Sequence, residues 1–286
     1  MRRRDFLAFP LPFLLGLSAR PAWSAVARVG EKYLEKDWRL PRNTTVDIWP
    51  VEIGMDLSQA ISAVGDWSIP SNSKLVIRLR DGEHKLSSQV VPKVADGERL
   101  AIVGNLANPE KCRIVWEKPE DMFYVAAGHC LGLVDGVTIE HLRPASRSLG
   151  SAFLADAGGL IRCGANVQVR NFYYGFQARY GGSILCNRTQ SSNAGDANYF
   201  AFNGGHIQAE GARAEFAADR EKGLGGGFVA EYGGTINAPG SIARHNALSG
   251  YVALSNGVIR AYDSLAEFNG RAGYYSNTGG IIVAHR

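Results

Sequence analysis

A pattern that occurs six times in the second half of the chain restricts the fold more than any other feature. Each copy reads aromatic-x-Ala-x-x-small-Gly-x-Ile, and only the last copy replaces the Ala, by Ser276. Successive copies are 23 residues apart, except for one interval of 29. A repeat of this length is typical of stacked units that are each too small to bury an apolar face alone. The isoleucines that end the six copies are Ile161, Ile184, Ile207, Ile236, Ile259 and Ile282.

Within each copy the apolar residues alternate with polar ones, which indicates strands rather than helices. In the first copy Phe153, Ala155, Ile161 and Cys163 share one parity, whereas Arg162 has the other. Alternation of this kind marks a strand with one buried face. Helical repeats are disfavoured as well, because each of the 34 glycines would weaken a helix by roughly 1 kcal/mol.

A unit of 23 residues has room for three short strands and three turns. Stacking such units in register places each strand roughly 4.8 Å from its equivalent in the next unit. The sequence therefore predicts an all-β solenoid of ~23-residue coils, with ladders of Ile, Ala and aromatic residues inside. We expect Asn171, Asn246 and Asn269 to lie at one turn of each coil, because Asn tolerates left-handed turns and can bond to the backbone of the next coil.

The repeat resembles the right-handed parallel β-helices of the pectin-lyase-like superfamily. The residues that carry the resemblance are the Asn-x-x-x-Gly-aromatic unit, for example Asn246 to Tyr251, and the Gly-x-Ile strand that follows it. Residues 75–86 are similar to a first rung of such proteins, and 100–104 and 133–139 to later rungs. The resemblance covers roughly Val51 to Arg286 and implies a right-handed parallel β-helix of about nine rungs. It is specific for fold and not for activity, because one fold can carry many functions.

The N-terminal part divides into two segments. Residues 1–27 are typical of an export signal, with three arginines, an apolar stretch and a small-residue cleavage site; the arginine pair resembles the twin-arginine motif. An uncleaved anchor is the alternative. Residues 28–72 are predicted to wrap around the outside and to form a capping helix from Asp56 to Trp67, with Asp56 as N-cap and Gln59 at the third position. The β-helix is expected to occupy residues 73–286.

Charge and composition exclude some partners and suggest a compartment. Four arginines and one aspartate in residues 1–27 account for +3 of the formal charge of +4, which leaves +1 for the rest. This favours neither nucleic acid nor an anionic membrane surface as a partner. No later segment has the length of a transmembrane helix. Together with the export signal in residues 1–27, this predicts a periplasmic or secreted protein with no membrane span in the mature chain.

Cysteines and acidic residues give no clear metal site. Cys163 and Cys186 are one period apart at an inward position, so they are expected to be stacked neighbours, either as a disulfide or as a reduced pair. No Cys/His cluster has the spacing of a zinc site. A calcium ion is compatible with the predicted function, but the sequence identifies no site for Ca²⁺ and no other cofactor.

The outward parity places several chemically active side chains in columns along the stack. One column contains Asp156, Arg179, Phe202 and Glu231, a second contains His206, and a third contains Arg260. The interval of 29 residues lies near these columns, with the extra residues around Arg220 to Gly227. A glycine-rich loop that interrupts a regular stack is a common place for a functional site.

These columns suggest a groove for polysaccharide. Asp156 and Glu231 are candidates for the acid and the base of glycoside hydrolysis, and Arg179 or His206 for the base of a lyase. The candidate substrate-binding residues are Phe202, Tyr180, Tyr232 and Arg260. The structural alternative is that Asp156 and Arg179 form an ordinary cross-strand ion pair, and that His206 is a solvated strand residue.

The pectin hydrolase signatures Asn-Thr-Asp, Asp-Asp, Gly-His-Gly and Arg-Ile-Lys are absent from the sequence, and Gly205-His206-Ile207 matches one of them only in part. The predicted function is therefore an exported β-helix protein that engages polysaccharide on its lateral face, with a lyase or hydrolase activity left open. The alternative is a non-catalytic structural or adhesive surface module. In that case the C-terminal edge, where a rung begins at Gly279, would pair with another copy.

Overall fold

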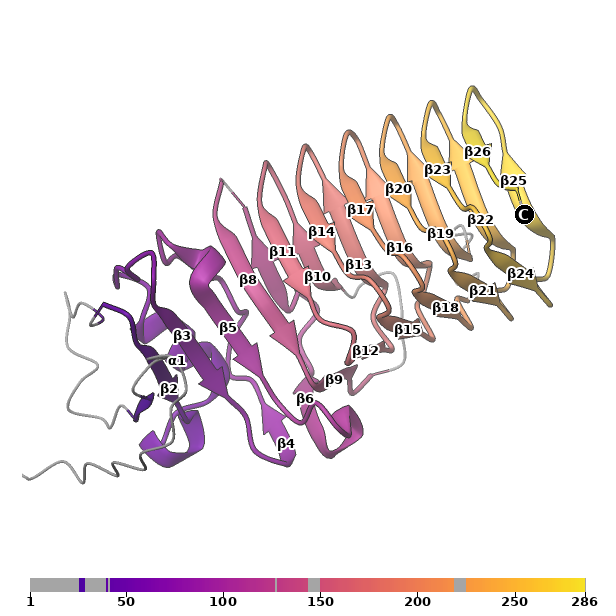
Figure 1. Ribbon diagram of the computed structural model, residues 1–286. Coiled ribbons are helices and arrows are strands. Elements are labelled where there is room, and N and C mark those ends of the chain that lie inside the picture. The colour runs from indigo at the N-terminus through magenta and orange to yellow at the C-terminus, as the bar shows by residue number, and fades with distance from the viewer. Residues whose placement is uncertain are drawn as a thin grey trace, which may run out of the picture.

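The computed structural model describes residues 26–28, 40, 42–126, 128–143, 150–218 and 225–285. Over these ranges the chain is a right-handed parallel β-helix of about nine rungs, as the repeat and the resemblance predicted. Figure 1 shows the rungs following one another along one axis, from the indigo end to the yellow end. Most of the predicted export signal lies outside the described residues.

In the described residues the stack is built from three parallel sheets of 11, 7 and 8 strands, and from β8 onward the strands follow one another in the order sheet I, sheet III, sheet II. Sheet I comprises β1 (Val26–Arg28), β2 (Thr45–Ile48), β3 (Lys74–Arg78), β5 (Leu100–Val103), β8 (Cys130–Asp135), β11 (Leu160–Cys163), β14 (Ser183–Leu185), β17 (His206–Gln208), β20 (Thr235–Asn237), β23 (Val258–Arg260) and β26 (Ile281–Val283). Sheet II comprises β7 (Phe123–Val125), β10 (Ser151–Ala155), β13 (Tyr174–Arg179), β16 (Ala197–Phe202), β19 (Gly226–Glu231), β22 (Ser249–Leu254) and β25 (Ala272–Ser276). Sheet III comprises β4 (Gly82–Lys85), β6 (Cys112–Trp116), β9 (Val137–His141), β12 (Val167–Arg170), β15 (Gln190–Ser192), β18 (Arg213–Glu215), β21 (Ile242–Arg244) and β24 (Leu265–Glu267).

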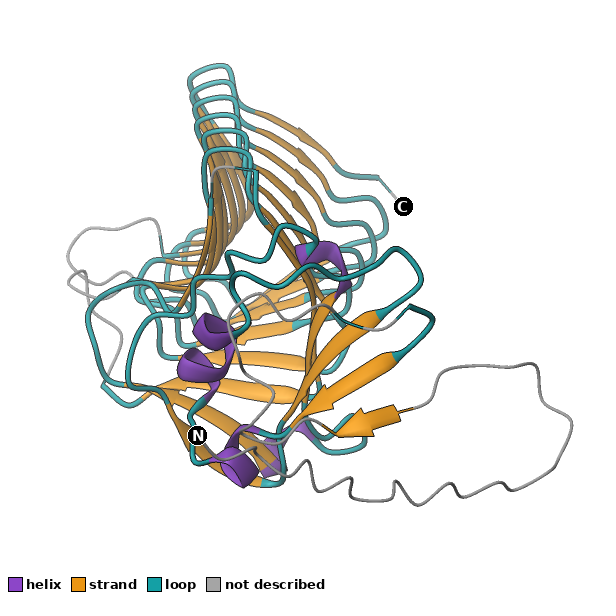
Figure 2. Ribbon diagram, turned by 90° about the vertical axis from the view of Figure 1, so that its left-hand side faces the viewer, coloured by secondary structure: helices purple, strands orange, loops and turns teal. Residues whose placement is uncertain are grey.

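The register of the rungs is the one that the repeat predicts. The repeated isoleucines face each other across successive strands of sheet I, for example Ile184 and Ile207. The repeated alanines do the same in sheet II, as Ala178 and Ala201 show. Figure 2 shows the turns of successive rungs lined up behind one another. The 29-residue interval does not disturb this register, because its extra residues lie between β18 and β19.

The core is a continuous column of apolar side chains between the three sheets. The aromatic residue that opens each copy stacks on its equivalent in the next rung, with ring centroids 4.7 to 5.2 Å apart from Phe123 to Tyr274. Tyrosine hydroxyls inside the column are hydrogen bonded: the Tyr199 hydroxyl is 3.0 Å from Thr189 Oγ1, and the Tyr251 hydroxyl is 2.8 Å from Ser241 Oγ. Ring packing and satisfied hydroxyls together stabilise the interior.

The N-terminal end contains the only α-helix in the described residues, α1 (Leu57–Ala63), which ends before Trp67, where the helix was predicted to end. The Asp56 side chain accepts a hydrogen bond from the Gln59 backbone N–H, and the Gln59 side chain accepts one from the Asp56 backbone N–H, as predicted. The apolar face of α1 is buried in the same core as β2 and β3, which lie beside it in Figure 1. The described part of the chain also contains 3-10 helices at Pro50–Ile53, Gly97–Arg99 and Pro109–Lys111.

One N-terminal segment differs from its prediction. The segment before α1 was expected to wrap around the outside, but Thr45 to Ile48 pair in parallel with β3 and extend sheet I. Stacked strands therefore begin before residue 73. Val46 and Ile48 alternate with polar residues and are fully buried, which explains why this short run joins the sheet.

The asparagines lie at the turn between sheets III and II, but only partly as expected. Asn171 has a positive φ of 66°, whereas at the equivalent turns of later rungs the positive φ belongs to His245 and Phe268, one residue before Asn246 and Asn269. Asn246 and Asn269 bond to the backbone of neighbouring rungs: Asn246 Nδ2 donates to the carbonyl of Ala214 and Asn269 Nδ2 to that of Ala243. The predicted bonding between rungs is confirmed for Asn246 and Asn269, but it runs to the backbone of the preceding rung and not of the next one, and the left-handed conformation predicted for these two residues was wrong.

Candidate functional site

The outer face of sheet II carries most of the candidate residues. Arg179, Phe202 and Glu231 occupy equivalent positions on three successive strands, β13, β16 and β19. Tyr180 and Tyr232 follow two of these strands directly, at the turn into sheet I. Both have positive φ angles, 50° and 47°. We call this surface the sheet II face and define it by Tyr174, Tyr180, Phe200, Phe202 and Tyr232, together with the charged groups beside them.

The aromatic side chains of the sheet II face contact one another in a continuous row. The Phe202 ring is 6.3 Å from the Tyr180 ring and 5.3 Å from the Tyr232 ring, edge to face in both cases. It also lies 5.6 Å from Phe200, whose ring stacks on Tyr174 at 4.7 Å. Tyr180 and Tyr232 are 52% and 58% exposed. The predicted binding residues Phe202, Tyr180 and Tyr232 therefore form one cluster that solvent can reach.

Asp156 and Arg179 form an ion pair at the edge of this cluster. Arg179 Nη2 donates to Asp156 Oδ2 at 2.9 Å, and the side chains are 34% and 11% exposed. The Tyr124 hydroxyl is 3.4 Å from the same carboxylate oxygen. Burial alone would lower the pKa of Arg179, but the hydrogen bond and the charge of Asp156 outweigh it and raise that pKa. This arrangement fits the structural alternative of a cross-strand pair, and it holds Arg179 in its protonated form.

The geometry does not bring Asp156 and Glu231 together as an acid and a base. Register places Asp156 beside Arg179, Arg179 beside Phe202, and Phe202 beside Glu231. Three strand spacings separate the two carboxylates, or about 14 Å. Glycosidase carboxylates lie about 5 to 9.5 Å apart. The two residues therefore share a column without forming a hydrolytic pair.

A different acidic group affects Glu231. Burial, followed by the charge of Asp196, raises the pKa of Glu231. Tyr174 is hydrogen bonded to Asp196, and burial together with that carboxylate raises the pKa of the tyrosine. Asp196 Oδ1 also accepts a hydrogen bond from the Gly225 N–H, just after residues 219–224, which lie outside the described residues. The carboxylates of Asp196 and Glu231 therefore lie beside Tyr174, at the end of the aromatic cluster.

His206 and Arg260 lie on sheet I, not on the sheet II face. His206 begins β17 and Arg260 ends β23. The inward residues of sheets I and II share one core, so the outward residues of the two sheets lie on different faces of the stack. Burial and then the positive charge of Arg260 lower the pKa of His206. The prediction that the columns on both sides of the Gly-Gly turn make one site was therefore wrong: Arg179, Phe202 and Glu231 share one column on sheet II, whereas His206 and Arg260 lie on sheet I.

Two members of the sheet II face, Tyr174 and Phe200, were not among the predicted site residues. Tyr174 shares the parity of the inward Phe176, so strict alternation assigns it to the core. In the structure Gly175 and Phe176 both point inward: a Cβ added at Gly175 would lie 2.1 Å from the buried Ser191 Oγ. This bulge turns Tyr174 outward, where it stacks on Phe200. Glycines that recur at this place, as in Gly227 and Gly250, are the sequence signal for it.

The cysteines are free thiols in the structure. Cys163 and Cys186 follow paired positions of β11 and β14, as expected for stacked neighbours, and the reduced form is the one observed. Burial raises the pKa of both thiols. In the described part of the chain no three His, Cys, Asp or Glu side chains gather closely enough to hold a metal ion.

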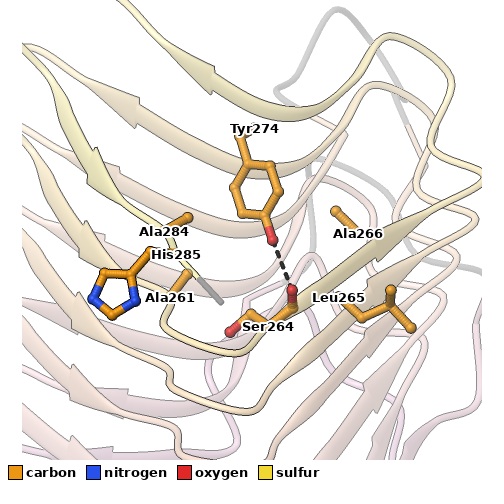
Figure 3. Close-up of a pocket in the computed structure, with 7 residues that line it drawn as sticks. All are labelled: Ala261, Ser264, Leu265, Ala266, Tyr274, Ala284 and His285. Carbon is orange, nitrogen blue, oxygen red and sulfur yellow. Dashed lines mark hydrogen bonds between the residues drawn. The ribbon is translucent and has the colours of Figure 1, made fainter.

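A pocket of about 300 Å³ lies at the C-terminal rung. Figure 3 shows Tyr274 pointing into it, with its hydroxyl donating a 2.9 Å hydrogen bond to the carbonyl of Ser264. Its lining is mostly small and apolar, and includes Ala261, Ala266 and Ala284. The pocket is thus the interior of the last rung rather than a site with convergent polar groups.

No helix in the described ranges has both the length and the apolar character needed to cross a bilayer. The chain matches no protein-family model, no curated protein and no solved structure. The fold and the sheet II face therefore carry the functional argument.

Proposed function

We propose that this chain is an exported β-helix protein that binds polysaccharide along its lateral face, through the sheet II face. The observation that carries the proposal is the row of contacting rings from Tyr174 to Tyr232, with two half-exposed tyrosines at its rim. The C–H groups of a sugar ring carry slight positive charge and pack on the negative face of an aromatic ring. Rings repeated along one axis suit a ligand that itself repeats.

The backbone at the two tyrosines supports a functional role. Tyr180 and Tyr232 occupy a left-handed turn position at which other rungs carry Ala157, Asn203 and Ser255. A bulky side chain with positive φ is uncommon and costs of order 1 kcal/mol or more. Two tyrosines placed there against that cost, beside one phenylalanine, favour a binding surface over a purely structural turn.

Export and family membership are parts of the same proposal. The arginine-rich leader supports a periplasmic or secreted location. Three parallel sheets with a ladder of inward asparagines support membership of the pectin-lyase-like superfamily. Catalysis is not part of the proposal, because Asp156 is paired with Arg179 and lies about 14 Å from Glu231.

We expect Tyr232→Ser and Phe202→Leu each to weaken polysaccharide binding roughly tenfold, since loss of one stacked ring removes about 1.4 kcal/mol. Both substitutions introduce the residue that another rung carries at the same position, Ser255 and Leu254, so the fold should be preserved. Affinity electrophoresis in gels that contain neutral or acidic polysaccharides measures the effect.

Thr278→Ser is the matched control, because it changes the same turn position outside the aromatic cluster. If no polysaccharide retards the native protein, or if the two variants migrate like the native protein, the proposal fails. New reducing ends or unsaturated products, formed by the native protein and lost in Glu231→Gln, would instead make the protein an enzyme.

A structural module that assembles through its C-terminal edge is the second candidate. In the described residues β24, β25 and β26 are each last in their sheets, and Tyr274, which belongs to the inner aromatic column, is 40% exposed there. Strands at a sheet edge present unpaired backbone groups to another chain. Sedimentation velocity should then show self-association that Ile282→Glu abolishes, because Ile282 is an inward position of the last rung. Ile281→Glu is the outward control, and a monomer at all concentrations would rule this candidate out.

A further inference from the structure

A second pocket lies on the outer face of sheet III, away from the sheet II face. Its volume is about 430 Å³, within the range of small-molecule sites. Strands β12, β15 and β18 form its floor. The residues that line it are Gln168, Val169, Arg170, Gln190, Ser191, Ser192, Asn193, Arg213, Glu215 and Phe216.

The pocket exists because side chains become short at one rung. Register places Ser192 between Arg170 and Glu215, and the next residue, Asn193, precedes Phe216 by one rung. A serine between two long side chains leaves a notch in the surface. The notch is bounded by amide groups, because Gln168 and Gln190 face each other across β12 and β15.

Phe216 provides an aromatic wall at one end of the notch. Its ring stacks on His245 at 5.1 Å with planes 6° apart, and His245 stacks on Phe268 at 5.2 Å and 9°. Because the three rings stack along the axis, one face of Phe216 is covered by His245 and the other is directed at the rung of Asn193. Phe216 is 49% exposed.

The backbone conformation of Phe216 starts a stack of rings at the edge of the pocket. Phe216 has a φ of 55°, at a turn position where the two preceding rungs carry Asn171 and Asn193. Asparagine tolerates this conformation well and phenylalanine does not. His245 and Phe268 have the same left-handed conformation at the next two rungs, so the chain holds a stack of three rings in this geometry, and Phe216 is the ring of the stack that borders the pocket.

The charges of the pocket leave one cation available. Arg170 is paired with Glu110 and donates to Gln168 at 2.7 Å, and Glu215 accepts from Arg244 at 2.8 Å. Across the described residues, the Arg213 guanidinium has neither an ion pair nor a side-chain hydrogen bond within the protein. With two arginines and one glutamate, the lining has a formal charge of +1.

We infer that this pocket binds a single sugar ring that carries one carboxylate. The C–H face of the ring packs on Phe216, its hydroxyls bond to Gln168, Gln190 and Ser192, and its carboxylate pairs with Arg213. Arginine with a carboxylate forms a charge-assisted, planar pair. The inference shares the ligand class of the proposed function, but it uses a different face and different residues.

The test uses methyl glucuronoside, its methyl ester and methyl glucoside as probes, with binding measured by ligand-observed NMR titration on the full chain. The native protein should bind the acid at least tenfold more tightly than the ester. Arg213→Gln should reduce the affinity for the acid to that for the ester, and Phe216→Asn should weaken both at least tenfold. Both substitutions introduce residues that neighbouring rungs carry at the same positions, Gln190 and Asn193.

Phe268→Asn is the matched control, because it makes the same change two rungs away and outside the pocket, and it should leave both affinities unchanged. Equal affinity for acid and ester in the native protein, or unchanged binding in Phe216→Asn, would overturn the inference. Tyr232→Ser separates it from the proposed function. If Tyr232→Ser and not Phe216→Asn removes binding of the acid, the pocket is not the site. If the acid binds while no polysaccharide retards the protein, the pocket stands and the sheet II proposal fails.

Discussion

Gly205→Ala is expected to lower the free energy of unfolding by about 3 kcal/mol or more. Gly205 is the glycine of the repeated Gly-x-Ile, and a Cβ placed on it would lie 2.0 Å from the carbonyl oxygen of Ala178 and 2.3 Å from its carbonyl carbon. These are backbone atoms of the preceding rung, so they cannot move aside without breaking the register of sheets I and II. Urea unfolding followed by circular dichroism would measure the loss as a lower midpoint.

Gly204→Asn is the matched control for that substitution. Gly204 is the neighbouring residue and has a φ of 77°, but nothing lies closer to its missing Cβ than the backbone nitrogen of Gly181 at 4.0 Å. A later rung carries Asn256 at this position with a φ of 65°. We expect Gly204→Asn to change stability by less than about 1 kcal/mol. If both variants lose the same free energy of unfolding, then backbone flexibility, and not the close approach of the preceding rung, explains why Gly is repeated in the Gly-x-Ile strands.

The glycines of the six Gly-x-Ile strands illustrate how much of the fold the sequence could predict. All six glycines of the Gly-x-Ile strands meet a backbone carbonyl of the preceding rung at 2.0 to 2.2 Å from an added Cβ. A fixed interval between identical residues is enough to predict that equivalent positions stack, and hence the register. The carbonyl that requires each glycine belongs to a residue 27 to 34 positions earlier, for example Ala178 for Gly205. Spacing alone does not give that contact.

In the rungs of Tyr199 and Tyr251, the tyrosine in the aromatic column occurs together with a buried Ser or Thr. The sequence contains this correlation, but only the structure explains it. Rungs with Tyr199 and Tyr251 in the aromatic column carry Thr189 and Ser241 at the turn between sheets I and III, and the hydroxyls bond to each other. The rung with Phe228 carries Ala212 at that turn, which needs no partner. A tyrosine buried without such a hydroxyl would leave its O–H unsatisfied.

The candidate site was harder to predict than the fold, because it depends on which sheet each column belongs to. Period-2 alternation identifies outward residues but not the angle of the turn between two strands. Arg179 and His206 are both outward, yet they lie on sheets II and I. The aromatic cluster on sheet II was found in part because Phe202, Tyr180 and Tyr232 follow from register alone. The sheet III pocket depends on the small size of Ser192 and the ring plane of Phe216, which no periodicity encodes.

Asn246→Leu is expected to cost about 3 kcal/mol or more of folding stability, because Asn246 connects several rungs in the interior. Its Oδ1 accepts hydrogen bonds from the Ala217 N–H at 3.0 Å and from Asn198 Nδ2 at 3.2 Å. Its Nδ2 donates to the Ala214 carbonyl at 3.2 Å and to Asn269 Oδ1 at 2.9 Å. Leucine has a similar size but neither donates nor accepts, so each buried partner that is left unpaired costs about 1 to 3 kcal/mol.

Asn277→Leu provides the comparison, since it is the same chemical change at an exposed position where the preceding rung already carries Leu254. Its effect should stay within about 0.5 kcal/mol. The midpoint and the slope of urea unfolding should be measured for both variants, because a stack of rungs can lose its cooperativity when one interface is weakened. A lower midpoint for Asn246→Leu with an unchanged slope would show that the rungs on either side of Asn246 unfold together. A lower slope would show that the stack separates at Asn246 into parts that unfold independently. An unchanged midpoint would mean that the hydrogen bonds of Asn246 set the turn geometry without stabilising the fold.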